Sequence, residues 1–236
     1  MSTVTTLRLF GRISRYWGPT ELSGCPYGTL VYASCPGDVP DNVLQALHPA
    51  ERRYASGLQG DRRREWIAGR YCLAVAIGKF TSRRNPVLPL RSGAPALPSG
   101  LRGSLSHKSF LTVALAAKSP AKLGVDVEFS EHADVRLAGK VLTATEQARF
   151  AVVDGSLSSL FVVAHFALKE AIYKASRAAQ QQALDFDRIE LTVPSEKLLK
   201  EGSWLAVPAR LVSGRCRVNA AILRYGKWII AAASCV

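Results

Sequence analysis

Features that identify several common classes of protein are scarce in this sequence. Its five cysteines are odd in number and none forms a C-x-x-C pair. This spacing predicts neither a zinc site nor a disulfide framework, so we expect reduced thiols in a cytosolic protein. We find no internal repeat and no apolar run approaching the roughly 20 residues that a membrane-spanning helix needs. The sequence is therefore expected to be globular and without a membrane span.

Acidic residues are also scarce, with 18 of them against 31 lysines and arginines, a formal net charge of +13. Within residues 52–102 only Asp61 and Glu65 oppose a run of basic residues. These are Arg52, Arg53, Arg62, Arg63, Arg64, Arg70, Lys79, Arg83, Arg84, Arg91 and Arg102. Such an excess predicts an anionic partner, which could be nucleic acid, a membrane surface or a polyphosphate ligand. The absence of an RNP-like aromatic pattern, zinc-finger spacing or an evident helix-turn-helix argues against nucleic acid.

The first twenty residues lack the apolar core of a signal peptide. They are basic and carry no acid before Glu21, a composition that faintly resembles a transit peptide. Arg12 and Arg15, with the aromatic residues around them, are equally typical of a surface arm, which we favour. A cytoplasmic location is therefore expected.

Residues 123–129 predict a strand, because β-branched and aromatic residues alternate there with two acids. Asp126 and Glu128 are two positions apart and so lie on the same face, with Val127 on the other. Two carboxylates this close need a positive partner, either an oxygen-preferring cation such as Mg²⁺ or a fixed Lys or Arg. An ordinary solvated face of an edge strand is an equally good interpretation of this segment alone.

Residues 160–179 predict a long helix, because they are rich in alanine and contain neither Gly nor Pro. Phe166, Glu170 and Lys174 follow one another at intervals of four and form one ridge. Glu170 and Lys174 could be a surface pair, but most of this helix is apolar, which indicates burial. A buried Glu and Lys need partners, and a third carboxylate facing Asp126 and Glu128 would complete a Mg²⁺ site.

The remaining elements are expected as follows. Helices are predicted over 40–58 and 61–80, a Pro- and Gly-rich loop over 83–103, and helical spacing over 133–150. A strand over 29–35 and another over 111–117 precede a turn at 118–122, which predicts a hairpin into 123–129. From residue 185 onward the pattern turns to short strands, which we expect to form one sheet on the long helix.

Four stretches resemble the motifs of one family. Gly124-Val-Asp-Val-Glu128 and Phe166-Ala-Leu-Lys-Glu-Ala-Ile-Tyr-Lys174 are similar to the two signature motifs of the 4′-phosphopantetheinyl transferases. Gly93-Ala-Pro95 with Gly103-Ser-Leu-Ser-His107, and Arg63-Arg-Glu-Trp-Ile-Ala-Gly-Arg70, resemble upstream stretches of the surfactin-type enzymes, closest to the enterobactin-synthetase group. The four occur in the family's order and together cover roughly residues 45–175.

This resemblance implies a role for individual residues. Asp126, Glu128 and Glu170 would hold Mg²⁺, with Mn²⁺ as an alternative, while Glu170 could also act as general base and Lys174 would neutralise or protonate the leaving phosphate. Coenzyme A, the implied substrate, would be bound by Arg63, Arg64, Arg70, Gly93, Pro95, Ser106, His107 and Lys174. Ala94 stands where some relatives have Lys. Glu146 matches a position near the metal in some members, and is equally typical of an acid in the first turn of a helix.

The resemblance also implies the fold and the partners. The fold would be α+β, a pseudo-dimer of two similar α/β halves, each a small, mainly antiparallel sheet packed on a long helix. Residues 1–118 would form the coenzyme-binding half and residues 119–236 the metal-binding half, and such a chain would be a monomer. The implied reaction transfers 4′-phosphopantetheine from coenzyme A to a serine of an apo carrier protein, releasing adenosine 3′,5′-bisphosphate. Carrier domains of polyketide, nonribosomal peptide or fatty-acid synthases would be the partners, with a preference for secondary metabolism or siderophore synthesis.

Two binding functions compete with this enzymatic interpretation. The basic chain could bind nucleic acid, or it could be a degenerate transferase that holds coenzyme A without reacting. Presence of all three acids together with Lys174 argues against degeneracy. We therefore expect a holo-[carrier-protein] synthase.

Overall fold

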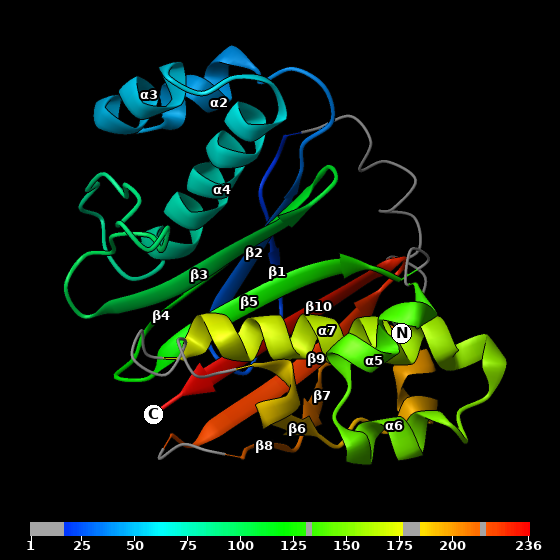
Figure 1. Ribbon diagram of the computed structural model, residues 1–236. Coiled ribbons are helices and arrows are strands. Elements are labelled where there is room, and N and C mark those ends of the chain that lie inside the picture. Colours follow the sequence, from blue (N-terminus) through cyan, green and yellow to red (C-terminus); the bar gives the residue numbers. More distant parts are fainter. Residues whose placement is uncertain (1–16, 131–133, 177–184, 213–215) are drawn as a thin grey trace, which may run out of the picture. The chain divides into compact units, whose positions relative to one another are not determined.

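The computed structural model describes residues 17–130, 134–176, 185–212 and 216–236 (Figure 1). These residues divide into two compact units. The N-terminal unit contains the described residues up to Ser23 and from Thr29 to Lys118, and the C-terminal unit contains Gly24–Gly28 and the described residues from Ser119 onward. What each half binds stays a prediction. The basic start of the chain, with Arg12 and Arg15, lies outside the described residues.

The N-terminal unit is built on a four-stranded antiparallel sheet in the order β1-β2-β4-β3. Its strands are β1 (Thr20–Leu22), β2 (Thr29–Ser34), β3 (Leu101–Lys108) and β4 (Leu111–Lys118). The long helix α4 (Gly60–Gly78) packs on β4, β2 and β3. Ile67, Leu73 and Ile77 bury their side chains in the same core as Val31 and Ala114. The predicted helix over 61–80 is therefore confirmed.

The predicted single helix over 40–58 is wrong, because the chain forms α2 (Asp41–Ala46) and then α3 (Pro49–Ser56). Pro49 disfavours the helical conformation at the residue before it, and His48 is accordingly extended. His48 caps α3 instead: its Nδ1 accepts the amide N–H of Ala50 at 3.1 Å. Glu51 completes the capping box by accepting the amide N–H of His48 at 2.9 Å.

The C-terminal unit is built on a second four-stranded antiparallel sheet, in the order β5-β10-β9-β7. Its strands are β5 (Lys122–Phe129), β7 (Leu205–Val207), β9 (Val218–Tyr225) and β10 (Trp228–Cys235). The long helix α7 (Ser158–Ala175) packs on β5, β10 and β9 (Figure 1). Each unit thus has an antiparallel sheet and one long helix, which confirms the predicted α+β fold class.

Shorter elements surround α7 in this unit. They are α5 (Ala138–Val141), α6 (Ala144–Phe150), the 3₁₀ turns η3 (Val135–Leu137), η4 (Gly155–Leu157), η5 (Phe186–Arg188) and η6 (Ser195–Leu199), and the strands β6 (Ile189–Leu191) and β8 (Ala209–Leu211). Strands β6 and β8 pair with each other in a separate two-stranded sheet. The predicted single sheet after residue 185 is therefore wrong.

The hairpin predicted at 118–122 is also wrong, because β4 and β5 belong to different sheets. The turn that closes a hairpin lies one connection earlier, at Ser109–Phe110 between β3 and β4. Ser109 has φ of +53°, a left-handed conformation that such a tight turn requires.

The segment 155–175 is apolar and long enough to cross a membrane by length and composition, contrary to the sequence-based expectation. In the structure most of that stretch is buried, and α7 contributes Ala164, Leu168, Ala171 and Ile172 to the main core of its unit. Burial inside a folded unit explains its composition, because a helix that is apolar around most of its circumference is typical of a protein core.

The expectation that all thiols are reduced is wrong for one pair, since Cys216 and Cys235 form a disulfide with their Cα atoms 6.0 Å apart. The two cysteines meet because β9 and β10 are antiparallel and Cys235 lies opposite Val218. Their 19-residue separation gives no such signal in the sequence. Cys25, Cys35 and Cys72 are free thiols.

Candidate active site

A close approach of α7 to β5 depends on Gly124. A Cβ atom at this position would collide with the carbonyl oxygen of Ala171 and lie only 2.7 Å from the amide nitrogen of Ala175. Both are backbone atoms of α7, which cannot rotate away as a side chain could. The glycine therefore lets the helix pack directly on the strand that carries Asp126 and Glu128.

We expect Gly124→Ala to destabilise the protein by about 3 kcal/mol or more, because the added methyl group must push two backbones apart. Urea unfolding followed by circular dichroism measures the change. Gly139→Ala is the matched control: Gly139 is helical and exposed, and a Cβ atom there meets nothing within 4 Å. Because alanine favours a helix more than glycine does, the free energy of unfolding of Gly139→Ala should equal that of the wild type or be slightly higher. Equal stability of both variants would contradict the role of Gly124.

Three acidic side chains gather where β5 and α7 meet. Asp126 is buried at 4% exposure, and Glu128, two residues on, is half-buried on the same strand face. Glu170 extends from α7. Burial raises the pKa of Glu170, and the charges of Asp126 and Glu128 raise it further, while Lys174 lowers it. The structure therefore brings the three predicted acids into one electrostatic neighbourhood.

Lys174 is a positive group bound to one of these acids, Asp126. Its Nζ donates to Oδ1 of Asp126 at 2.6 Å and to the carbonyl oxygen of Val125 at 3.2 Å. In the part of the chain that the structure describes, no three His, Cys, Asp or Glu side chains are arranged as a metal-binding group. The donor set nevertheless fits a hard cation, since it consists of carboxylates alone. A cation bound here would contact Asp126 either together with Lys174 or in its place.

Of the predicted coenzyme-binding residues, all but Lys174 lie in the N-terminal unit, where His107 on β3 meets the start of α4. His107 Nε2 lies 3.1 Å from Oε2 of Glu65. Arg64, on the same turn of α4, pairs with Asp61 at 2.8 Å, and Arg63 is half-buried beside it. We call Arg63, Arg64, Glu65 and His107 the His107 cluster: Glu65 pairs with His107, and Arg63 and Arg64 directly precede Glu65 in α4.

Arg70 lies further along α4 and is buried, with 4% exposure. Its guanidinium lies over the ring of Trp66, 4.8 Å from the centroid, and Trp66 stacks on Tyr54. Burial lowers the pKa of Arg70, and the carboxylate of Glu51 partly offsets this. Within the described residues its Nε has no hydrogen-bond partner. A buried cationic donor in this state is costly unless an anion approaches it.

The structure separates the other predicted contacts from this cluster. Ser106 is buried and, as the neighbour of His107 in β3, points to the opposite face of the sheet. Gly93 and Pro95 lie in the loop between α4 and β3, where the amide of Leu90 donates to the carbonyl of Ala94 at 2.8 Å. Gly93 has φ of +83°, so a side chain there would strain this turn.

Lys169 is a residue that the sequence argument missed. It is fully buried, and its Nζ donates to Oε2 of Glu146 at 2.6 Å and to the carbonyls of Val141 at 2.7 Å and Phe186 at 2.9 Å. It thus ties α5, α6 and η5 to α7, one residue before Glu170. The signal was available, because a lysine in an apolar helix needs a buried partner just as Lys174 does.

Glu146 belongs to this network and not to the acids on β5. Its Oε2 also accepts the amide N–H of Thr143 at 2.8 Å, and its Oε1 accepts that of Leu191 at 2.7 Å. Thr143 reciprocates in a capping box at the start of α6. Of the two interpretations that the sequence left open for Glu146, the acid in the first helical turn describes its position.

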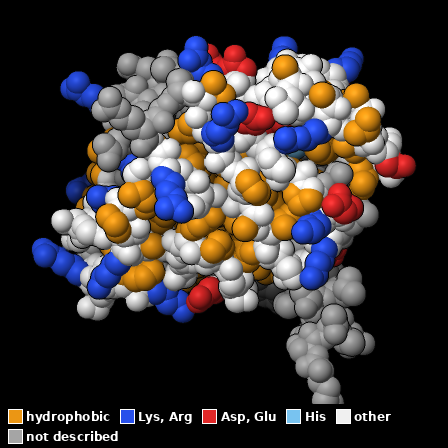
Figure 2. Space-filling view, turned by 90° about the horizontal axis from the view of Figure 1, so that it is seen from below, with side chains coloured by type: hydrophobic (Ala, Val, Ile, Leu, Met, Phe, Trp, Pro, Cys, Tyr) orange, Lys and Arg blue, Asp and Glu red, His pale blue; other side chains and the backbone are white. Residues whose placement is uncertain are grey.

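Positive charge is spread over the surface. On the face drawn in Figure 2, Lys and Arg side chains lie among neutral and apolar ones, and the described residues show no continuous basic stripe there. Several arginines have structural partners: Arg52 donates to the backbone and side-chain oxygens of Gln45, and Arg149 donates to the carbonyl of Leu191. Part of the basic excess is therefore used within the fold.

Comparison with known proteins agrees with this arrangement. Residues 50–117 match the model of the 4′-phosphopantetheinyl transferase N-terminal domain, and residues 122–206 match that of the 4′-phosphopantetheinyl transferase superfamily. The chain is 30% identical over 188 residues to 4′-phosphopantetheinyl transferase Svp of Streptomyces mobaraensis, covering 75% of this chain and 73% of Svp. The chain belongs to the 4′-phosphopantetheinyl transferase family. It is therefore an enzyme that modifies carrier proteins, as the motifs predicted.

Two further relatives extend this similarity. Enterobactin synthase component D of Escherichia coli K12 is 30% identical over 170 residues, which cover 70% of this chain and 79% of that protein. 4′-Phosphopantetheinyl transferase Npt of Nocardia iowensis is 26% identical over 193 residues, covering 78% of this chain and 84% of Npt. Membership of the two-halved type is thereby confirmed, because the transferase matches extend over both units.

Proposed function

We propose that this transferase binds a divalent cation, Mg²⁺ or Mn²⁺, through Asp126, Glu128 and Glu170 in its C-terminal unit. The observation that supports the proposal is that burial raises the pKa of Glu170 on α7 and that Asp126 and Glu128 on β5 lie close enough to raise it further with their charges. When bound, such a cation supplies positive charge to a reacting pyrophosphate. All other steps are assigned to side chains of this chain.

Glu170 is proposed to accept the proton from the serine hydroxyl of the apo carrier protein. A raised pKa suits a general base that works near neutral pH. The serine oxygen forms a bond to the β-phosphorus of coenzyme A, and the bond between that phosphorus and the bridging oxygen breaks. Adenosine 3′,5′-bisphosphate leaves, and Lys174 offsets the negative charge on its phosphate.

The phosphates of coenzyme A are proposed to bind in the N-terminal unit. Arg63 and Arg64 directly precede Glu65, the residue that pairs with His107, and Arg70 adds a buried guanidinium on the same helix. Arginine suits phosphate because its planar fork donates two parallel hydrogen bonds. Ser106 is proposed to contribute through the backbone. Gly93 and Pro95 are proposed to shape the loop between α4 and β3, because the amide of Gly93 already donates to the carbonyl of Leu90 at 2.9 Å and a proline has no N–H.

Removal of the 3′-phosphate of coenzyme A tests this pocket. The wild-type enzyme should bind 3′-dephospho-coenzyme A about tenfold or more weakly than coenzyme A, because charged hydrogen bonds are lost. In His107→Ala this preference should shrink, as measured by calorimetry with both ligands. Equal weakening of both ligands by the substitution would place His107 away from the 3′-phosphate.

The carrier partners are proposed to be domains of polyketide or nonribosomal peptide synthases, in secondary metabolism or siderophore synthesis, with fatty-acid carriers as further candidates. Similarity to enterobactin synthase component D supports this preference. A monomeric chain in the cytoplasm is proposed as well.

Incubation with coenzyme A and a panel of apo carrier proteins, read by intact-protein mass spectrometry, tests the proposal directly. A carrier should gain one phosphopantetheine arm in the presence of Mg²⁺ and stay unmodified when the cation is removed by a chelator. Transfer that is unaffected by chelation would overturn the metal assignment. Coenzyme A binding without modification of any carrier would favour the degenerate-transferase alternative.

A further inference from the structure

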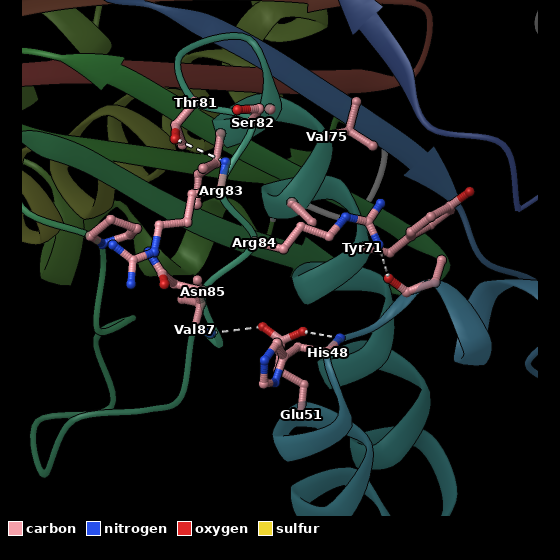
Figure 3. A pocket seen from close by; sticks show the side chains of 15 residues that line it. His48, Glu51, Tyr71, Val75, Thr81, Ser82, Arg83, Arg84, Asn85 and Val87 are labelled. Atoms are coloured by element: carbon pink, nitrogen blue, oxygen red, sulfur yellow. Dashed lines mark hydrogen bonds between the residues drawn. The ribbon is translucent and has the colours of Figure 1, made fainter.

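A cavity of about 280 Å³ lies on the side of α4 that faces α2 and α3, wholly within the N-terminal unit (Figure 3). Its walls come from the α2–α3 junction, the last two turns of α4, the loop 81–87 and Pro98. Its volume is close to the lower end of the range for small-molecule sites, about 300–1,000 Å³. The proposed transfer reaction uses none of the residues that line it.

The walls of this cavity are fastened together by hydrogen bonds. Buried Glu51 accepts the amide N–H of Val87 at 2.8 Å and that of His48 at 2.9 Å, which joins the loop to the start of α3 (Figure 3). Arg84 Nη1 donates to the carbonyl of Ala46 at 2.9 Å and ties the same loop to the end of α2. These contacts hold the cavity open as a formed feature of the unit.

The interior combines an apolar wall with donor groups. Val75, Ile77 and Val87 supply apolar surface, and Ile77 and Val87 are themselves buried. Arg83 lines the cavity and is exposed, and within the described residues its guanidinium has no hydrogen-bond or ion-pair partner. The ring of His48 accepts a hydrogen bond at Nδ1, so its neutral form carries the proton on Nε2 as a donor.

The charges around the cavity favour an anion. Among the described residues that line it, Glu51 is the only carboxylate, and both its oxygens already accept amide hydrogen bonds. The buried guanidinium of Arg70 lies close enough to Glu51 to interact with its charge. Arg83 and Arg84 add two positive charges at the mouth, which outweigh the negative end of α4.

This cavity is distinct from the His107 cluster. Glu65, which pairs with His107, is 6 positions before Tyr71 and 13 before Gly78, the first and last residues of α4 that line the cavity. At 1.5 Å per residue these two are about 9 and 20 Å from Glu65 along the helix. Arg70 itself does not line the cavity.

We propose that this cavity binds a small organic anion, with its apolar body on the Val75, Ile77 and Val87 wall and its carboxylate or phosphate on Arg83. Calorimetry of the full chain with hexanoate and with phenyl phosphate tests the two head groups separately. At least one of them should bind at millimolar concentration or tighter, while hexylammonium and benzyl alcohol should not. Absence of binding by both anions, or equal binding of hexylammonium, would overturn the proposal.

Two variants place the bound anion in the cavity. Arg83→Glu should weaken binding about tenfold or more, since a charged hydrogen bond is replaced by repulsion. Arg53→Glu, an exposed change on α3 outside the cavity, is the matched control and should leave binding unchanged. Val75→Trp should fill the cavity and block the probe, with circular dichroism confirming the fold. Equal affinities for wild type, Arg83→Glu and Arg53→Glu would refute the site.

Saturating coenzyme A separates this proposal from the transfer reaction. The anion should bind with the same affinity in its presence, because the two sites are different. Displacement of the anion by coenzyme A would show that the cavity belongs to the substrate site. It would overturn the proposal that the cavity is a separate binding site. Neither result depends on whether Glu170 is the base or whether a metal binds, so the two proposals fail independently.

Discussion

Replacing Glu170 by Gln is expected to abolish carrier modification without unfolding the protein. Glu170 is given two roles, as ligand of the divalent cation and as acceptor of the serine proton, and an amide fulfils neither well. Loss of a general base alone slows a reaction about 10²–10⁴-fold. The measurement is the initial rate of phosphopantetheine transfer to an apo carrier, followed by mass spectrometry.

Glu190→Gln is the matched control for this experiment. It is the same chemical change in the same unit, on β6, where Glu190 pairs with exposed Arg210 at 2.7 Å. Its transfer rate should equal that of the wild type. Asp126→Asn should lose transfer activity as Glu170→Gln does, because Asp126 is proposed to bind the same cation. Normal transfer by either active-site variant would remove the metal assignment.

The raised pKa of Glu170 adds a dependence on pH. The carboxyl must lose its proton before it can bind a cation, and burial together with Asp126 and Glu128 makes that loss harder. The Mg²⁺ concentration needed for half-maximal transfer should therefore rise as the pH is lowered. If the Mg²⁺ concentration for half-maximal transfer stayed constant down to the ordinary pKa of a glutamate, loss of the Glu170 proton would not be linked to cation binding.

The sequence predicted those parts of the fold and site that depend on local pattern. Alternation in a strand places Asp126 and Glu128 on one face, and helical spacing places Glu170 one turn before Lys174; neither inference needs knowledge of distant contacts. The long helices α4 and α7 were predicted for the same reason. Gly124 entered only as a motif residue, since its close approach to Ala171 depends on a contact between segments more than forty residues apart.

Errors arose where pairing between distant segments decides the structure. A turn between two strands predicts a hairpin only if both strands join one sheet, and β4 and β5 do not. The contact of Cys216 with Cys235 likewise follows from the register of β9 and β10. One error was local and avoidable: Pro49 marks a helix start after a capping residue, which divides 40–58 into two helices.

The buried pair of Lys169 and Glu146 gives the largest expected effect on stability. Both side chains have no exposed surface, and Lys169 also donates to two backbone carbonyls. Lys169→Met would leave the carboxylate of Glu146 buried without its cation, which typically costs about 3–5 kcal/mol. Urea unfolding of the variant should show this loss, and Lys79→Met should not exceed about 1 kcal/mol, because Lys79 and Glu21 form an exposed pair.

A double variant distinguishes charge from packing at this position. Glu146→Gln removes the uncompensated carboxylate while its side-chain oxygen can still accept the amide of Thr143 or Leu191, so adding it to Lys169→Met should restore part of the lost stability. Additive losses would instead mean that Lys169 acts through its packing and its backbone hydrogen bonds. In either case α7 would be held less firmly against α5, α6 and η5, one residue from Glu170. We therefore expect the single variant to transfer phosphopantetheine more slowly even at temperatures where it stays folded, with a larger Mg²⁺ requirement than the Lys79→Met control.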